Sequence, residues 1–239
     1  ADASGLLFKE LRSFEIHPFT CGYEFIDQIA GVVNGWIVSP DGNIIRNFFF
    51  FFFNGDPVGI RRYDSWKRKE LFLKDVVSGK ANRDHGKFMS RHFNESFRKD
   101  IVLKFPEEVV FYTFNFSYGW LIIVSTNELS NTHEQIIARF TKVFEQTYTR
   151  FLDLQKAEAQ AREAQIEAAL ERVRARSMAM HKSDELSDVV ALLFAEIRPF
   201  GFASSGIELI LPDEPNDILQ FWSTGPGMVV AECFNIPRT

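Results

Sequence analysis

The side chains that most often perform catalysis are few in this 239-residue chain, and they stand far apart. No two histidines have the tight spacing, with a cysteine or glutamate nearby, that a zinc site requires. The histidines are His17, His85, His92, His133 and His181. We therefore predict no metal site and no catalytic residue. A phosphoacceptor role for His133, which precedes Glu134 where a helix is expected to begin, remains an alternative.

Other sequence signals also disfavour several functional classes. There is no glycine-rich phosphate loop, no nucleophile elbow and no kinase signature. The net charge of −5 disfavours nucleic acid as the main partner. With Cys21 and Cys233 as its only cysteines, the chain fits a reducing compartment. Because no signal segment and no run of about 20 apolar residues is present, we expect a cytoplasmic protein without a membrane span.

An internal repeat organises the chain. Residues 6–14 read LLFKELRSF and residues 192–200 read LLFAEIRPF, with six of nine positions identical. The same offset of 186 positions (192 minus 6) places Trp36 on Trp222 and Asp27 on Asp213. It also places the alternating apolar residues of 21–25 on those of 207–211, and such alternation is typical of a strand with one buried face. We interpret the chain as a tandem array.

The repeat divides the chain into three predicted regions. Residues 1–131 form a first domain, residues 132–182 a long linker helix, and residues 183–239 the start of a second copy of the first domain. The first domain is expected to have an α/β (α+β) fold, in which a mainly antiparallel sheet is flanked by helices. Its predicted elements are a helix over 4–14, strands over 20–26 and 32–39, a helix and strand over 65–78, and a hairpin over 111–125.

Phenylalanine is the most distinctive residue of the composition. The chain has 26, against 4 Trp and 5 Tyr, and six of them are consecutive from Phe48 to Phe53. Successive strand side chains point to opposite faces, so this run predicts a central strand that is apolar on both. The phenylalanine side chains would then form part of either a solid core or a ligand pocket. The candidate pocket residues are Trp36, Phe49, Phe51, Phe53, Phe114 and Phe116.

No proline or glycine occurs between Thr132 and Met180, which predicts a helix of about 70 Å at ~1.5 Å per residue. Its first apolar stripe, on the side expected to face the core, consists of Phe140, Phe144, Thr147, Phe151 and Leu154, spaced three or four residues apart. A second stripe, from Ile166 to Met180, has heptad spacing, with a change of phase between residues 154 and 166. Left alone in water, this stripe would be exposed, so we predict a parallel homodimer. The predicted dimer seam contains Phe151, Leu154, Ile166, Leu170, Val173 and Met180. Folding of the helix back on its own domain is the alternative.

The segment from Arg139 to Gln160 and its continuation from Ile166 to Met180 resemble the linker of bacterial tandem GAF-like sensor proteins. The opening helices, the stretch Trp66-Lys-Arg-Lys-Glu and the hairpin before the long helix are similar to that group too. The resemblance implies a GAF-like fold with a small-molecule pocket, upstream of a histidine kinase or nucleotide cyclase output. A covalent bilin is not expected, since Cys21 and Cys233 precede Gly22 and Phe234 rather than histidine. The cofactor, if there is one, stays unknown.

These observations predict a non-catalytic sensory or regulatory module of a signal-transduction protein, such as a two-component system. Binding of a small molecule or a partner would be relayed through the paired linker helix to a C-terminal output domain. A structural dimerisation spacer without a ligand is the first alternative. An enzyme that uses the GAF-like pocket is the second.

Overall fold

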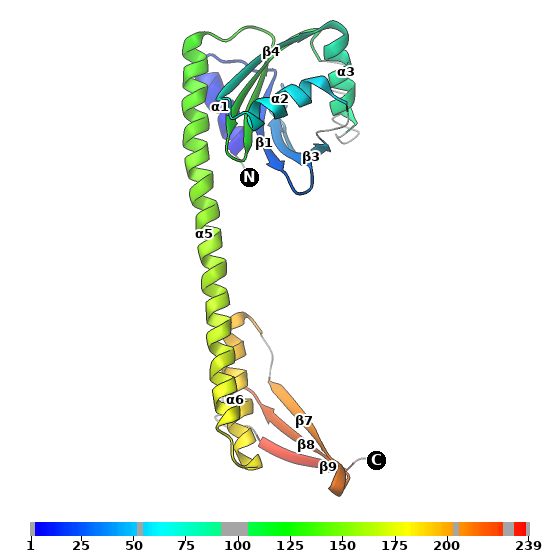
Figure 1. The fold of residues 1–239 in the computed structure, drawn as a ribbon, viewed down its shortest axis with the longest axis vertical. Coiled ribbons are helices and arrows are strands. Elements are labelled where there is room, and N and C mark those ends of the chain that lie inside the picture. Colours follow the sequence, from blue (N-terminus) through cyan, green and yellow to red (C-terminus); the bar gives the residue numbers. More distant parts are fainter. Residues whose placement is uncertain (1–2, 52–54, 92–104, 203–205, 227–231, 238–239) are drawn as a thin grey trace. The chain divides into compact units, whose positions relative to one another are not determined.

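The computed structural model describes residues 3–51, 55–91, 105–202, 206–226 and 232–237 (Figure 1). The chain divides into two compact units, Ala1–Arg150 and Phe151–Thr239. The helix α5, Asn131–Met178, is 48 residues long and belongs to both units. No helix in the described ranges is long and apolar enough to cross a membrane.

A six-stranded sheet forms the centre of the first unit. The strand order is β3-β2-β1-β6-β5-β4, and all neighbouring strands run antiparallel. The strands are β1 Thr20–Asp27, β2 Val32–Val38, β3 Ile44–Phe51, β4 Phe72–Ser78, β5 Glu108–Phe116 and β6 Gly119–Ser125. This architecture confirms the mixed α/β class and the antiparallel sheet.

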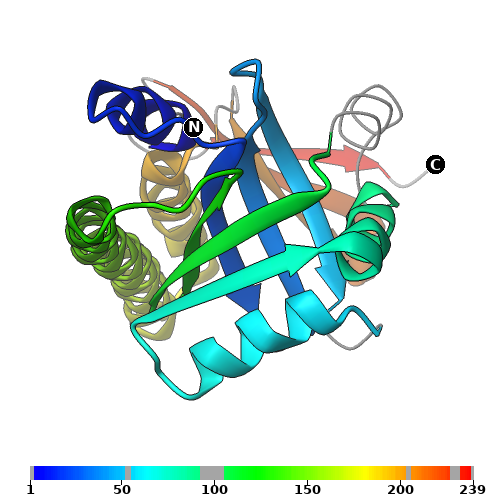
Figure 2. The ribbon, with the colours of Figure 1, turned by 90° about the horizontal axis from the view of Figure 1, so that it is seen from above.

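Helices cover both faces of this sheet (Figure 2). Helix α1, Ala3–Ser13, and the first turns of α5 pack on one face, which we call the α5 face. Helices α2, Pro57–Lys67, and α3, Gly79–Ser90, pack on the other, which we call the α2/α3 face. Strand β5 shows the alternation, because Val109 and Phe111 belong to the core of the α2/α3 face, and Val110 and Tyr112 to that of the α5 face.

The phenylalanine run does not lie in a central strand. Strand β3 is at the edge of the sheet, and among the described strands it pairs with β2 alone, for example Phe50 with Val33. The prediction of a central strand is wrong because a continuous apolar run does not by itself determine the position of a strand in the order of the sheet. Phe52 and Phe53 and the side chains of the rest of the run lie outside the described residues.

Helix α2 begins at Pro57, eight residues before the helix and strand that the sequence predicted over 65–78. Asp56 is its N-cap and accepts a hydrogen bond from the Gly59 amide at 2.8 Å, and Pro57 occupies the first helical position. Aspartate followed by proline is a recognised helix start, so the Asp56-Pro57 pair was the missed signal.

The second unit repeats the first elements of the first unit. It contains α6 Leu186–Ile197, β7 Ile207–Asp213, β8 Ile218–Thr224 and β9 Glu232–Pro237, with short 3-10 turns η1 Ser183–Glu185, η2 Arg198–Phe200 and η3 Glu214–Asn216. Cys21 pairs with Val38, and 186 positions later Ile207 pairs with Thr224. The pairing of Val32 with Phe51 likewise recurs as Ile218 with Pro237. The sequence repeat is therefore also a repeat of strand register.

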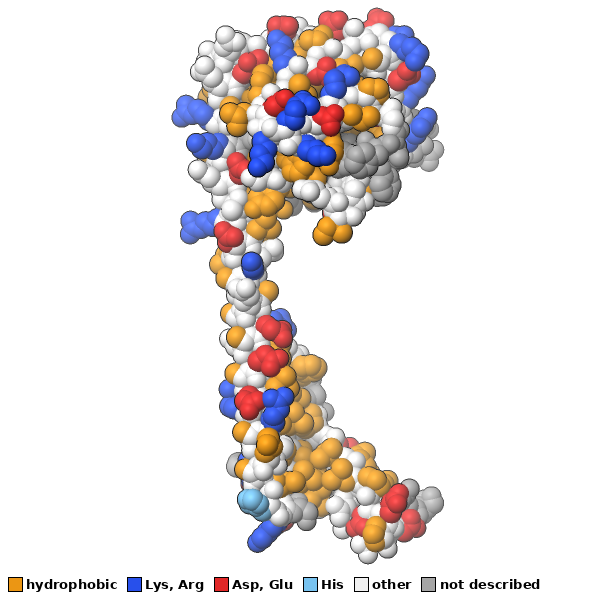
Figure 3. Space-filling view, viewed as in Figure 1, with side chains coloured by type: hydrophobic (Ala, Val, Ile, Leu, Met, Phe, Trp, Pro, Cys, Tyr) orange, Lys and Arg blue, Asp and Glu red, His pale blue; other side chains and the backbone are white. Residues whose placement is uncertain are grey.

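The core of the second unit is small. Val190 and Trp222 are buried, with Leu186 and Ile207 packed against them. Several large apolar side chains on its strands are exposed, and apolar side chains gather over this part of the surface in Figure 3. They are Leu209, Ile210, Leu211, Phe234 and Ile236. The predicted domain limits at residues 131 and 182 stay predictions, since the division into compact units falls within α5.

Candidate functional site

Five polar or amphipathic side chains are buried together on the α2/α3 face of the first unit. Glu24 comes from β1, Trp120 from β6 and His85 from α3, while Asp56 and Arg62 come from the cap and the body of α2. Each of the five is at most 6% exposed. Charged side chains are seldom buried without a specific role or partner, so this cluster is the strongest candidate for a functional site.

Glu24 and Trp120 are direct neighbours on the paired strands β1 and β6. The indole Nε1 of Trp120 donates a hydrogen bond to Glu24 Oε2 at 2.5 Å, and Arg62 Nη1 lies 3.7 Å from the same oxygen. Burial raises the pKa of the Glu24 carboxyl, although Arg62 and the Trp120 hydrogen bond act in the opposite direction. The group is therefore easier to protonate than an ordinary glutamate.

Asp56 and His85 form the second half of the cluster. His85 Nδ1 lies 2.9 Å from Asp56 Oδ2, the oxygen that also accepts the Gly59 amide. Burial lowers the pKa of His85, against the effect of the hydrogen bond to Asp56. Burial alone would raise the pKa of Asp56, but the His85 hydrogen bond and the nearby charges lower it below its usual range. The pair is therefore a neutral imidazole that donates Nδ1–H to a carboxylate.

A small cavity of about 40 Å³ adjoins the cluster. Its polar lining includes Glu24, Arg62 and His85, and most of the remaining lining is apolar. The apolar residues are Ile37, Met89, Phe105, Phe111, Ile122 and Val124. The volume is close to the share that one water molecule occupies in the liquid, about 30 Å³.

Arg62 is incompletely paired although its side chain is only 1% exposed. Within the described part of the chain, its Nε and Nη2 atoms have no hydrogen-bond partner, and the guanidinium carbon lies 5.2 Å from the centre of the Phe111 ring. A buried donor without a partner costs about 1–3 kcal/mol, and more for a charged group. The site therefore lacks an acceptor, which a water molecule or a ligand can supply.

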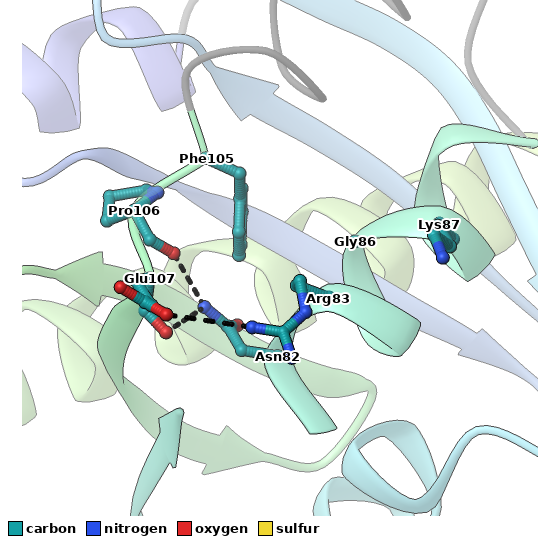
Figure 4. A pocket seen from close by; sticks show the side chains of 7 residues that line it. All are labelled: Asn82, Arg83, Gly86, Lys87, Phe105, Pro106 and Glu107. Carbon is teal, nitrogen blue, oxygen red and sulfur yellow. Dashed lines mark hydrogen bonds and ion pairs between the residues drawn. The ribbon is translucent and has the colours of Figure 1, made fainter. Parts of the chain in front are cut away.

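An open pocket of about 320 Å³ lies beside the cavity and shares two residues with it, Gly86 and Phe105. Figure 4 shows Phe105 beside α3, with Asn82 and Arg83 below it and Lys87 further along the same helix. The Asn82 amide donates to the carbonyls of Pro106 at 2.7 Å and Glu107 at 3.3 Å, which fixes this wall. Phe105 and Gly86 thus line both the open pocket and the cavity beside Arg62.

The structure places the predicted pocket aromatics elsewhere. Phe114 and Phe116 are buried in the core of the α5 face, and Trp36 contacts Phe25, which packs on the same core. Phe116 also borders an open surface pocket with Trp66 and Asn115. The backbones of Phe49 and Phe51 lie in β3, but their side chains, and all of Phe53, fall outside the described residues. A pocket formed by these aromatics stays a prediction.

The predicted dimer seam is divided by the structure. Phe151, Leu154 and Leu170 are 50–58% exposed, whereas Ile166, Val173 and Met180 are half-buried within the second unit. There α6 is tied to α5 by ion pairs of Arg172 with Glu196 at 2.6 Å and of Arg176 with Asp188 at 2.6 Å. Helix α5 ends at Met178, so Met180 lies just beyond it.

Sequence reasoning did not single out the buried cluster. Glu24 stands between Tyr23 and Phe25 in a predicted strand. When one face of a strand is apolar, a charged residue on the opposite face is ordinarily expected to be exposed to solvent. The available signal lay in the neighbouring strand of the sheet. Trp120 stands within an apolar run there, which indicates that the face carrying Glu24 is buried too. His85 and Asp56 carried no local signal, because only the packing of α2 and α3 brings them together.

Comparison with known proteins adds no assignment, since no family model matches the chain and no curated protein matches it. Among the described residues, no group of three or more histidine, cysteine, aspartate or glutamate side chains is placed to hold a metal ion.

Proposed function

We propose that the chain is a non-catalytic sensory or regulatory module of a signal-transduction protein. In this proposal the first unit binds a small molecule or a partner, and α5 carries the response towards an output domain. The observation that supports it best is the buried cluster of Glu24, Arg62 and Trp120 beside a cavity, on the sheet face opposite α5.

Strand β1 connects the two faces. Glu24 faces the cavity, while its neighbours Tyr23 and Phe25 face α5. The Tyr23 ring stacks on Phe144 of α5 with 3.8 Å between ring centres, and Phe25 lies 4.9 Å from the ring of Tyr148 on the same helix. A change in the pairing of Glu24 therefore reaches the helix through one strand. Such coupling requires that the ligand binds two packing states unequally.

The β5–β6 hairpin offers a second link to α5. Glu145 Oε1 of the helix accepts hydrogen bonds from the Ser117 amide at 2.7 Å and from the Ser117 hydroxyl at 2.5 Å. Strand β6, which follows this turn, carries Trp120. The two strands that hold the Glu24–Trp120 pair are thus both attached to the helix.

The wider assignment follows the resemblance to bacterial tandem GAF-like sensors. The fold supports it at the level of an antiparallel sheet flanked by helices, followed by a long helix and a second α-β-β-β unit with the same register. In this proposal two copies of the chain pair in parallel through the exposed residues of α5, and the output is a histidine kinase or a nucleotide cyclase.

Native mass spectrometry of the purified chain, followed by hydrogen exchange, tests the sensory proposal. We expect a small molecule to bind in a one-to-one ratio and to change amide protection both in β1 and in the segment of α5 around Phe144. A ligand that changes protection in β1 alone would contradict the relay. A chain that binds no small molecule or protein partner would contradict the sensory function.

A structural spacer is the second candidate, and the small volume of the cavity favours it. In that case a water molecule completes the pairing of Arg62, and the unit serves only to hold α5. A crystal structure would then show a single ordered water molecule in the cavity, with the apolar side chains in contact around it.

A further inference from the structure

We infer that the cavity beside Arg62 binds a small organic carboxylate with an apolar body, an assignment that rests on the proposed sensory function of this site. The ligand would pair its two oxygens with the open edge of the guanidinium and place its body among the apolar side chains between the sheet and α3.

The open edge of Arg62 determines the chemistry of the ligand head. Nη1 lies 3.7 Å from Glu24, Nε and Nη2 have no hydrogen-bond partner, and the Arg62 side chain lines the cavity. These two nitrogens lie on the same edge of the guanidinium, and their parallel N–H groups match the two oxygens of a carboxylate. A single water molecule can satisfy only part of this edge, whereas a carboxylate can satisfy both donors.

The lining of the cavity determines the ligand body. Apart from Glu24, Arg62 and His85, and the hydroxyl of Thr20, the side chains that line it are apolar. Phe111 and Ile122 come from the sheet, Met89 comes from α3, and Phe105 closes the outer side. A strongly hydrophilic body would lose its hydration here without new partners, so an aliphatic or aromatic monocarboxylate fits better than a sugar acid or a dicarboxylate.

Phe105 and Gly86 supply the room that such a body needs. The cavity of about 40 Å³ is too small for it, but the open pocket beyond these two residues measures about 320 Å³. Gly86 presents no side chain to this partition, and a Cβ atom there would lie 3.8 Å from the Phe105 ring. Rotation of the Phe105 ring would join the two spaces, with the head at Arg62 and the body in the open pocket beside α3, whose lining Figure 4 shows.

The charges around Arg62 make binding depend on pH. The charge of Arg62 affects the pKa values of Glu24 in β1, Asp56 before α2 and His85 in α3. Asp56 and His85 also affect the pKa values of each other. A bound carboxylate beside ionised Glu24 would leave one negative charge unpaired in a buried site. Because burial already raises the pKa of Glu24, we expect this residue to take up a proton when the ligand binds. Binding should therefore weaken as the pH rises.

Fluorine NMR of the full chain labelled with 5-fluorotryptophan provides the test, since Trp120 is hydrogen-bonded to Glu24. Butyrate and benzoate serve as probes, and the neutral butyramide and benzamide serve as matched controls. We expect a saturable shift of the Trp120 signal with the acids and at least about tenfold weaker binding of the amides. Arg62→Lys, which keeps the charge and loses the paired donors, should weaken acid binding about tenfold. Arg61→Lys, at an exposed position of α2 that lines neither space, should leave it unchanged.

The outcomes separate this assignment from the sensory function. If the amides bind as tightly as the acids, the site binds small molecules but the carboxylate assignment is wrong. If neither class shifts Trp120, the carboxylate assignment also fails, and native mass spectrometry decides whether any other ligand preserves the sensory function. Should Arg62→Lys fail to fold, as shown by its circular dichroism spectrum, the comparison of acids with amides on the unmodified chain remains decisive.

Discussion

At the scale of the residue, the fold changes the pKa of the His85 imidazole. It is 3% exposed, donates to Asp56, and is faced by Arg62 of α2 and by Asp75 of β4. Burial lowers the pKa of His85 below its ordinary value of 6.5. The folded chain therefore holds a neutral imidazole under conditions in which the unfolded chain begins to bind a proton.

This arrangement predicts a defined loss of stability in mild acid. As the pH falls through 6.5, the unfolded state binds a proton at His85 that the folded state does not, so the free energy of unfolding decreases. His85→Gln keeps a donor for Asp56 but cannot titrate, and should flatten this slope between about pH 5 and 7 while costing about 1–3 kcal/mol at pH 8. Urea unfolding at several pH values measures both effects. An unchanged slope would show that His85 has the same pKa in the folded and the unfolded chain.

Glu24 and Arg62 allow a second prediction at the same scale. Arg62→Met removes the partner of a buried carboxyl and should destabilise the first unit by about 3–5 kcal/mol at neutral pH. The double variant Arg62→Met with Glu24→Leu removes both charges and should recover part of that loss. Chemical unfolding of the two single variants and the double variant gives the coupling energy. A coupling energy near zero would mean that the two residues do not act as a pair.

At the scale of the element, helix α5 contacts the sheet through a different set of residues from the one that its sequence pattern predicted. The predicted stripe contained Phe140, Phe144, Thr147, Phe151 and Leu154. In the structure Ile137 and Thr141 are buried, Phe144 and Tyr148 are half-buried, and Thr147 is exposed. Residues 137, 141, 144 and 148 are also spaced three or four apart, so the face in contact with the sheet is rotated about the helix axis from the predicted stripe and shares Phe144 with it. Phe144 is the central contact, because its ring meets Tyr23, Phe25 and Phe116.

Phe144→Ala should therefore release α5 from the sheet. Loss of a packed aromatic side chain typically costs about 3–5 kcal/mol, and we expect the lower end because Phe144 is half-buried. Hydrogen exchange in the segment of α5 before residue 150 should accelerate, while β5 and β6 keep most of their protection. Val143→Ala is the matched control, since Val143 is 61% exposed on the adjacent position and should change stability by less than about 0.5 kcal/mol. Equal effects of the two variants would contradict this view of the contact.

The turn between β5 and β6 depends on a glycine. Gly119 has φ of 153°, and a Cβ atom there would lie 2.0 Å from the backbone oxygen of Glu24. Gly119→Ala should push β6 away from β1, disturb the Glu24–Trp120 pair and destabilise the unit by more than about 2 kcal/mol. Gly86→Ala is the control, because its Cβ would make only ordinary contacts within a helix and should be neutral or slightly stabilising. Thermal unfolding compares the two, and an equal shift would contradict the close approach.

Periodicity predicted the local elements well and their partners less well. The strands over 20–26 and 32–39 and the hairpin over 111–125 are β1, β2, β5 and β6, with shifts of one to three residues at their ends. The six phenylalanines were assigned to the wrong place in the sheet, because strand order depends on contacts distant in the sequence. The cluster of Glu24, Asp56, Arg62, His85 and Trp120 was missed for the same reason, as four separate elements supply it: β1, α2 with its cap, α3 and β6.

At the scale of the whole molecule, the repeat was the most informative sequence feature. The offset of LLFKELRSF and LLFAEIRPF carried over to the register of β1 with β2 and to that of β2 with β3 from Val32 to Gly35, after which β2 and β3 shift by one residue. The site does not recur with it, since the position 186 residues after Glu24 is Ile210, which is 47% exposed. The two copies therefore share a backbone plan, and the buried charge pair belongs to the first copy alone. The resemblance to GAF-like sensors remains a proposal for both.

The parallel dimer is the prediction that belongs to this scale. Three of the seam residues are already half-buried within the second unit: Ile166, Val173 and Met180. A partner helix would therefore have to pack against the exposed residues Phe151, Leu154 and Leu170. Leu170 is 50% exposed, and placing a charge there should disrupt a paired seam with little effect on the folded chain. Light scattering should give the mass of two chains for the unmodified protein and of one chain for Leu170→Glu. Ala164→Glu introduces the same charge at an exposed position outside the predicted seam and should keep the dimer. A single-chain mass for all three proteins would show that the exposed apolar stripe of α5 does not pair two copies.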